Sequence, residues 1–516
     1  MNLLGRVGLG LVAVWLAAVP VVAHVGSPFI VFEGRAGDFP VQVVVRQPEV
    51  VPGLAEISVR ILGGNPTGVR VLPLHGNTDK SGAPRPDIAK PVPGETNLYT
   101  AALWFMNRGA YGIEVQVEGP SGGTAIVPVN SVAYDRKSMP AGLGIALAIV
   151  GAGLALGVIA IAMAAAREAT LPAGVPPSRG RWGWAALAGF VGVTAVGGAI
   201  FGGSAWWNQE DTRHITRVLY RQLAHKVTTV PAGSGTQLQL TLTDSRYGLR
   251  PYRPVPEHGK LVHLFVVGED TSLGVPALAH LHPHESGEKE FTCRLPNLPA
   301  GRYRVFTELT HEEGFTQTLT NSLELAEQTT ATGWSDPDDS AASAGPGAMS
   351  PVPVGDGLMV HLRVQAALPG EVSRLEARID QADGAPAPLE PYLRMLGHAV
   401  VMRDDGSVFG HLHPAGSLSM AAARTFARKL DGEAGVKATD ANCGDLEAVP
   451  AAVAAALGRR GEVSFPYVFP NAGNYFVWIQ VKVAGRIYTA PFRVTIGGQR
   501  AVATSSEREP TEAVEG

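Results

Sequence analysis

Ala279-His280-Leu281-His282-Pro283-His284 decides how this chain is interpreted, and it returns downstream as Gly410-His411-Leu412-His413-Pro414. Each copy follows another histidine, His263 in the first case and His398 in the second. Residues i and i+2 of a β-strand point to the same face, so the paired histidines of each copy share a face. The proline that follows marks the end of a strand or an edge position. The repeat therefore predicts two copies of one β-module.

A hairpin in the second copy brings the third histidine to the same face. A turn centred on Asp404-Asp405 places His398 opposite His411, whereas a turn centred on Asp405-Gly406 places it opposite His413. Directly opposed residues project from the same face of a sheet, so both registers gather the three imidazoles. In the first copy, a hairpin through residues 268–275 pairs His263 with His280 or His282 by the same parity.

Three imidazoles on one sheet face suit Cu(II), Zn(II) or Ni(II), and an oxidising exported location favours copper. The predicted metal ligands of the two copies are His263, His280, His282, His311, His398, His411 and His413. Further possible ligands are His284, Tyr392, Met395 and Met402, although packing is the commoner role for a methionine, and a thioether ligand would favour Cu(I). The remaining histidines that show no partner spacing are interpreted as structural, and they are His214, His225, His258 and His361.

Two other interpretations of these histidines stay open. In one, His-x-His-Pro is a hydrogen-bonded strand end on a wet face, and the modules form a scaffold of the cell envelope. In the other, the clusters belong to a metalloenzyme, with Glu308 and Glu312 available near His311. No sequence feature marks a substrate pocket, so we expect metal binding without catalysis.

The N-terminus reads as a secretory signal over residues 1–23, with one positive charge, an apolar run and small residues before the cleavage point. An uncleaved anchor is the alternative. Cleavage would leave His24 at the mature N-terminus, where its α-amine and imidazole could hold one copper ion together with His75.

Two uncharged apolar runs, residues 141–166 and 182–207, are each long enough to span a bilayer. The loop between them, residues 167–181, carries three arginines and one glutamate, which places it in the cytoplasm by the positive-inside rule. We therefore expect a helical hairpin, residues 139–207, in the cytoplasmic membrane. The flanking domains would both lie on the periplasmic or extracytoplasmic side.

The rest of the chain alternates short period-2 segments with glycine and proline turns, and a Gly-x-Tyr motif recurs at Gly109, Gly301 and Gly473. This predicts a mainly β protein with three immunoglobulin-like antiparallel sandwiches. The expected order is a sandwich at 24–135, the hairpin, a sandwich at 236–325, a flexible linker at 326–355, a sandwich at 357–497 and a disordered tail at 498–516. The insertion 415–462 in the last sandwich is interpreted as either a lid over the histidines or a surface excursion.

Composition limits the partners. The formal net charge of −4 offers no basic field for nucleic acid. Two cysteines, Cys293 and Cys443, exclude a disulfide scaffold. The partners that we expect are a metal ion, a lipid bilayer and a protein to which the metal is transferred.

Two resemblances add a context. The segment Trp104-Phe105-Met106, which leads into Gly109-Ala110-Tyr111-Gly112, resembles YtkA/FixH-like and CopC-like exported β-domains. The last module, with Glu390-Pro391-Tyr392-Leu393 and the motif around His411, resembles an uncharacterised bacterial exported domain whose members are associated with copper handling. These resemblances imply a sandwich fold and a role in copper homeostasis, with His398, His411 and His413 as the best-matched residues.

Overall fold

The computed structural model describes residues 26–134, 139–217, 219–232, 235–243, 254–327, 335–347, 350–430, 432 and 445–497. Within these residues the protein is mainly β, with several antiparallel sheets and two long apolar helices, which confirms the predicted fold at that level. The predicted signal, His24 and the C-terminal tail fall outside the described residues. The chain forms two compact units, one of which contains the β-modules and the other the helical hairpin.

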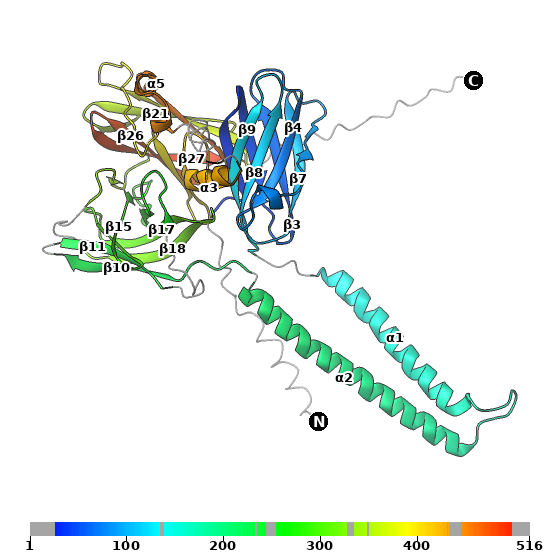
Figure 1. Cartoon of the computed structure of the whole chain (residues 1–516). Coiled ribbons are helices and arrows are strands. Elements are labelled where there is room, and N and C mark those ends of the chain that lie inside the picture. Colours follow the sequence, from blue (N-terminus) through cyan, green and yellow to red (C-terminus); the bar gives the residue numbers. More distant parts are fainter. Residues whose placement is uncertain are drawn as a thin grey trace, which may run out of the picture. The chain divides into compact units, whose positions relative to one another are not determined.

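The first module consists of two facing sheets (Figure 1). Inward positions alternate along the strand Phe39–Arg46, as Val41, Val43 and Val45 illustrate, and these side chains belong to one apolar core. One sheet is ordered β1 (Phe29–Ala36), β2 (Phe39–Arg46), β3 (Gly53–Ile61), β7 (Leu98–Phe105), β6 (Lys90–Pro91). The other is ordered β5 (Asp87–Ile88), β4 (Gly68–His75), β8 (Gly109–Glu118), β9 (Gly123–Ser131), and a short 3-10 helix covers Lys80–Gly82.

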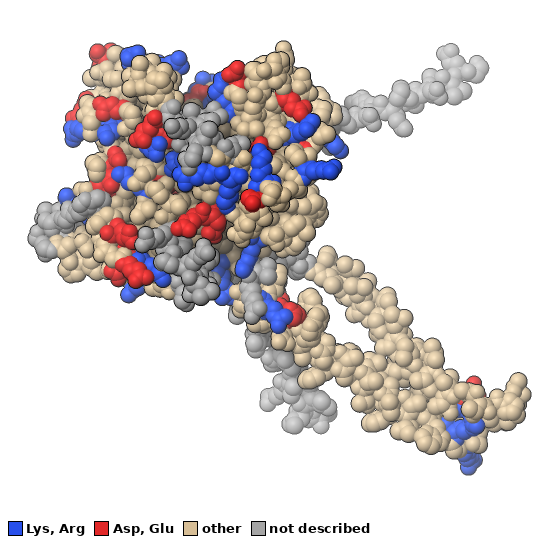
Figure 2. Space-filling model, viewed as in Figure 1, with Lys and Arg blue, Asp and Glu red and all other residues tan. Residues whose placement is uncertain are grey.

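The second unit is an antiparallel pair of helices, α1 (Ala141–Glu168) and α2 (Arg179–Arg217) (Figure 1). A Cβ added at Gly192 would lie 3.1 Å from the Cγ1 atom of Ile159, so this glycine allows the helices to approach closely. Both helices are long and apolar enough to cross a membrane, which is compatible with anchoring. Figure 2 shows the middle of the hairpin almost free of charge, with charged side chains near the connecting loop and at the opposite end of α2.

The second and third modules are each built from two antiparallel sheets. In the second, one sheet is ordered β10 (His225–Ala232), β11 (Gly235–Leu242), β16 (Glu290–Arg294), β15 (His284–Gly287). Its other sheet is ordered β12 (Pro254–Val255), β17 (Gly301–His311), β13 (His263–Gly268), β14 (Leu278–Leu281), β19 (Ser340–Ala342), and β18 (Thr316–Leu325) also pairs with β17. The third module has the orders β20 (Val352–Gly355), β21 (Leu358–Gln365), β22 (Val372–Asp380), β25 (Glu462–Val468) and β24 (Phe409–Leu412), β23 (His398–Arg403), β26 (Gly473–Val483), β27 (Arg486–Ile496).

The central strands β13 and β23 are buried on both faces. One face of each fills the core of its own module. The opposite faces pack against each other and form a separate apolar core between the modules, built from Phe265, Val267, Val275, Leu278, Phe306, Val400, Met402, Phe409, Phe476 and Trp478. The sheets that carry the histidines therefore face each other rather than solvent.

The contact between Phe306 and Phe409 gives a test of this packing, because the two rings stack with centroids 4.1 Å apart. Phe306→Ala is expected to lower the free energy of unfolding by about 3–5 kcal/mol, the usual cost of removing a buried phenyl ring. Chemical denaturation followed by tryptophan fluorescence measures this change. Leu273→Ala is the control, since Leu273 is 60% exposed, and an equal effect of both changes would contradict the packing described here.

The prediction of a flexible linker over 326–355 is wrong for much of that segment. β19 pairs with β14, and β20 belongs to a sheet of the third module. Lys260 holds the turn that precedes β19 through Asp336 and Asp338, with N–O distances of 2.6 and 3.1 Å. Composition suggested a linker, but these aspartates have specific partners on the second module.

The helix Met420–Leu430 of the insertion lies against the first and second modules, so this part of the insertion is not a free surface excursion. The insertion contains α3 (Met420–Leu430), a 3-10 turn at Leu446–Ala448 and α5 (Ala451–Gly458). Met420 and Ala423 join the core of the first module. The Glu257 carboxylate accepts hydrogen bonds from the backbone N–H groups of Met420 and Ala421, at 2.8 and 3.1 Å, and so caps α3.

Candidate metal centre

The strand registers confirm the predicted placement of three histidines on one face in each copy. β23 and β24 pair Val400 with His411, which is the register in which His398 lies opposite His413. β13 and β14 pair Phe265 with His280. The same register places His263 opposite His282, and the centroids of these two rings are 5.0 Å apart.

The two histidine faces meet in one buried cluster. Its members are between 0% and 7% exposed, and they are His258, His263, His280, His282, His398, His411 and His413. Two groups of three have ligand atoms that all lie within 4.8 Å of one another, which is close enough to hold a metal ion. The first group is His263, His280 and His282, and the second is His258, His398 and His413.

His258 was predicted to be structural because no partner spacing marked it, but the structure places it beside His398 and His413. His258 and Gly259 have positive φ angles of 50° and 86°, and they form a two-residue turn closed by two hydrogen bonds between Glu257 and Lys260. The turn brings the His258 Nε2 atom within 3.1 Å of the His413 Nε2 atom. A His-Gly pair shortly before His263 is the signal that could have revealed this turn.

His411 lies between the two groups. Its ring centroid is 5.2 Å from that of His398 and 4.8 Å from that of His413, both in the second group. It is also 5.2 Å from His280 and 5.3 Å from His263, both in the first group. The seven imidazoles are therefore contiguous.

In most of these rings, one nitrogen contacts an oxygen atom that lies outside the cluster. Four of them place Nδ1 beside an acceptor, namely His280 with Gln480 Oε1 at 2.9 Å, His282 with Asp339 Oδ1 at 3.1 Å, His411 with Glu308 Oε2 at 3.1 Å and His413 with the Leu418 carbonyl at 3.0 Å. A carbonyl or an ionised carboxylate beside Nδ1 accepts the ring proton there, which leaves Nε2 as an unprotonated lone pair. This is the arrangement in which metal-binding histidines are oriented by their outer partners.

The contact between His263 and His280 brings two ring nitrogens to 3.1 Å from each other. The Nε2 atom of His263 donates to the Glu257 carbonyl at 3.2 Å, so its Nδ1 atom is a lone pair. That Nδ1 atom lies 3.1 Å from the Nε2 atom of His280, which is also a lone pair because Nδ1 of His280 donates to Gln480. Two lone pairs at this distance repel each other unless a cation lies between them.

Burial keeps the imidazoles neutral. It lowers the pKa of His411 to about 3 and that of His413 to about 4, and it holds the pKa values of the other five well below their ordinary value. Burial also raises the pKa of Glu308 to about 7 and that of Asp339 to about 6. At neutral pH the histidines are unprotonated, which is the form that binds metal ions.

The interface has approximate two-fold symmetry. Glu308 lies opposite His263 in the register of β13 and β17. Gln480 lies opposite His398 in the register of β23 and β26. Each side chain crosses to the other module, since Glu308 contacts His411 and Gln480 contacts His280. Two duplicated modules thus exchange equivalent contacts, with a carboxylate at one position and an amide at the other.

Several predicted ligands lie outside the two groups. His311 ends β17 with its ring 5.6 Å from Phe315, and burial lowers its pKa to about 4. His284 is exposed on β15. Met395 and Met402 pack in apolar cores.

Tyr392 lies beside the cluster. Its ring centroid is 5.3 Å from that of His398, and its hydroxyl donates to the Asp338 carbonyl at 3.2 Å. His75 contacts the Arg108 carbonyl at 3.1 Å. Its predicted partner His24 is outside the described residues, so the proposed copper site at the mature N-terminus stays a prediction.

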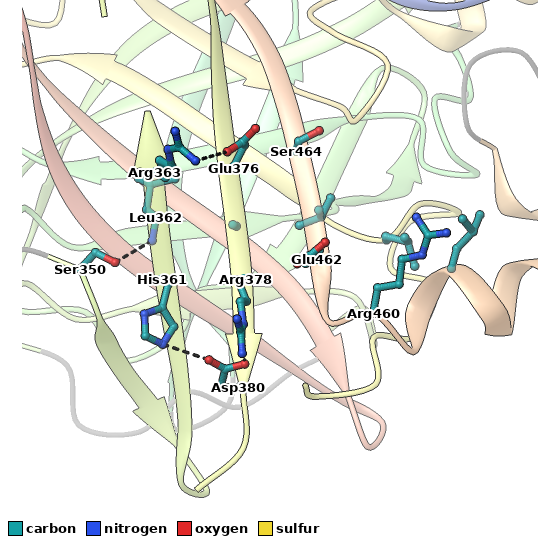
Figure 3. A pocket seen from close by; sticks show the side chains of 14 residues that line it. Ser350, His361, Leu362, Arg363, Glu376, Arg378, Asp380, Arg460, Glu462 and Ser464 are labelled. Atoms are coloured by element: carbon teal, nitrogen blue, oxygen red, sulfur yellow. Dashed lines mark hydrogen bonds and ion pairs between the residues drawn. The ribbon is translucent and has the colours of Figure 1, made fainter. Parts of the chain in front are cut away.

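A second candidate site is an open pocket of about 730 Å³ on the outer sheet of the third module (Figure 3). Side chains from β21, β22 and β25 line it, and His361 and Asp380 form an ion pair of 3.2 Å within it. His361 is already paired with a carboxylate and 42% of its side chain is exposed. The buried cluster is therefore the stronger metal site.

The fold and site define a mainly β protein with a helical hairpin and a buried histidine cluster that could hold a metal ion. Residues 352–498, less than a third of the chain, match the family model described as "Domain of unknown function (DUF8832)". No curated protein matches the chain.

The solved structures with some similarity are distant. The dimeric latent PorU of Porphyromonas gingivalis is 7% identical, with 91% of this chain and 34% of that one covered and a TM-score of 0.14. The native α2-macroglobulin of E. coli is 9% identical, with 91% and 24% covered and a TM-score of 0.17. A putative membrane anchored protein of Corynebacterium diphtheriae is 8% identical, with 92% and 97% covered and a TM-score of 0.14. This chain thus spans about a third and a quarter of the first two, and none of the three supports a functional argument.

Proposed function

We propose that this protein is a membrane-anchored, extracytoplasmic metal-binding protein that captures, buffers or passes on copper. The observation that carries the proposal is the pair of facing lone pairs on His263 and His280, 3.1 Å apart. A cation between them turns a repulsive contact into two coordinate bonds. The uncharged middle of the helical hairpin supports the anchoring, and the arginines of its loop support a cytoplasmic location for that loop.

Copper is preferred because the two groups consist of neutral imidazoles, without a thiolate or a carboxylate among their members. Such donors suit copper and also zinc or nickel, and copper heads the affinity order of these divalent ions. The resemblance of the modules to copper-associated exported domains favours the same metal. Binding is proposed rather than catalysis, since a catalytic metal keeps an open coordination position and this cluster is at most 7% exposed.

Metal analysis of the full chain in detergent tests the proposal. After loading with Cu(II), Zn(II) or Ni(II) and desalting, the parent is expected to retain copper at one ion or more per chain. His263→Ala combined with His280→Ala is expected to lower the copper content by at least half, because both facing lone pairs are lost. His361→Ala is the matched control, since it removes a histidine outside the cluster.

Failure of the parent to retain any of the three metals near stoichiometry would reject the metal-binding function. Preferential retention of zinc or nickel in competition would keep the function and reject copper. A double variant that holds as much copper as the parent would reject the site.

A further inference from the structure

The number of donors in the cluster exceeds what one ion can use. Five inward nitrogens have their lone pairs fixed by an oxygen partner on the other side of the ring, and they are Nδ1 of His263 and Nε2 of His280, His282, His411 and His413. His258 and His398 each add one more, which makes seven. Zinc and copper take about four ligands of this kind. One ion would leave about three buried nitrogens without a partner, each at an energetic cost.

The unpartnered nitrogens are distributed over the whole cluster. Among the described residues, no hydrogen-bond partner is present for Nε2 of His282, Nε2 of His411, Nδ1 of His258 or either nitrogen of His398. His282 belongs to the first group, His258 and His398 belong to the second, and His411 lies between them. A single ion in either group would leave the other group with buried, unpaired donors.

The two groups also differ in origin. His263, His280 and His282 all come from the second module. In the other group, His258 comes from the second module whereas His398 and His413 come from the third. An ion in this second group therefore has ligands on both modules.

We propose that the cluster binds two metal ions side by side, one within the second module and one that joins the second module to the third. The proposal rests on the metal-binding function above and adds its stoichiometry and arrangement. His411 lies beside both ions, and its Nε2 atom is available to either. The ion at His258, His398 and His413 links metal binding to the association of the two modules.

Copper content and electron paramagnetic resonance of the full chain in detergent test this arrangement. The parent loaded with Cu(II) in air is expected to hold two ions per chain. Its integrated spin signal is expected to fall below the copper count or to show dipolar broadening, because neighbouring Cu(II) ions couple magnetically. His361→Ala is expected to behave as the parent does.

Each group is then disabled separately. His263→Ala with His282→Ala is expected to leave one ion, and so is His258→Asn with His398→Leu. Asparagine is chosen at position 258 because it accepts the positive φ angle of that turn. Each double variant is expected to give a simple uncoupled Cu(II) signal whose intensity equals the copper content. Near-ultraviolet circular dichroism identifies variants that have lost the fold.

The outcomes separate this proposal from the general function. A parent that holds one ion, with a spin signal equal to its copper content, overturns the two-ion arrangement and leaves metal binding intact. A folded double variant that loses all copper also overturns it, since the groups would then form one site. A parent without copper overturns both proposals. Should a double variant unfold, the parent's copper count and spin signal still decide.

Discussion

Replacing His398 with leucine is expected to stabilise the metal-free protein and to weaken its stabilisation by metal. His398 is fully buried, and neither ring nitrogen has a hydrogen-bond partner among the described residues. Burial of an unsatisfied polar group costs about 1–3 kcal/mol, so an apolar side chain of similar size removes that cost. In the presence of metal, the free energy of unfolding of the parent rises by about 4 kcal/mol for an ion supplied at 1,000 times its dissociation constant. The variant loses the share contributed by the ion that His398 would bind.

The His398→Leu change is thus expected to raise the stability of the metal-free protein and to lower the gain in stability on metal binding. These opposite signs distinguish a metal ligand from a structural histidine. Chemical denaturation with a chelator and with added Cu(II) measures both effects. His225→Leu is the control, because His225 lies outside the cluster and its Nδ1 atom contacts the Leu223 carbonyl at 2.9 Å, so its loss should destabilise the protein with and without metal. Destabilisation of the metal-free protein by His398→Leu, with an unchanged response to copper, would mean that His398 serves only in packing.

Acidification is expected to destabilise the metal-free protein steeply below about pH 6.5. The seven histidines of the cluster have folded-state pKa values well below their ordinary value of 6.5. The folded state therefore binds fewer protons than the unfolded state as the pH falls through this range. The stability that neutral burial provides is fully present above pH 6.5 and is lost toward the folded-state pKa values.

Two carboxyl groups oppose this effect. The raised pKa values of Glu308 and Asp339, about 7 and about 6, let the folded state bind protons that the unfolded state does not bind near pH 5. On unfolding near pH 5, the seven histidines take up about seven protons and the two carboxyl groups release about two. The net uptake of about five protons corresponds to a slope of about 7 kcal/mol per pH unit in the free energy of unfolding. Fluorescence of Trp478, which is buried between the modules, reports the transition.

Bound metal competes with these protons, so copper is expected to move the acid transition to lower pH. Circular dichroism at several pH values, with chelator or with copper, provides the comparison. A transition that takes up only one proton, or one that copper leaves in place, would contradict neutral burial of the whole cluster.

The local geometry of the histidines followed from the sequence, because strand parity depends only on residue spacing. His398, His411 and His413 share a face in either turn register, and the observed register is one of the two predicted. Likewise, the helical hairpin followed from the length of its apolar runs. The local patterns did not reveal that the histidine-bearing sheet of the second module packs against that of the third.

A signal for that partner was present in the strands. Leu264-Phe265-Val266-Val267 and Ala399-Val400-Val401-Met402 are continuous apolar runs, which are typical of strands buried on both faces. The three histidines of each copy were predicted to share one sheet face, and no cover for that face was predicted. The apolar residues on the same face indicate such a cover. His258 was missed for a related reason, since its contact with His413 joins two modules and leaves no trace in residue spacing.

The enclosure of the cluster between two modules has a kinetic consequence. An ion bound there would be surrounded by imidazoles that are at most 7% exposed, so its exchange with solvent would require an opening of the cluster, such as separation of the two modules. Separation exposes the apolar contact around Phe306, Phe409 and Trp478, so the exchange rate is governed by the barrier to opening as well as by the strength of the metal–nitrogen bonds. The residence time of the ion would then respond to changes at those aromatic residues, even though none of them is a ligand.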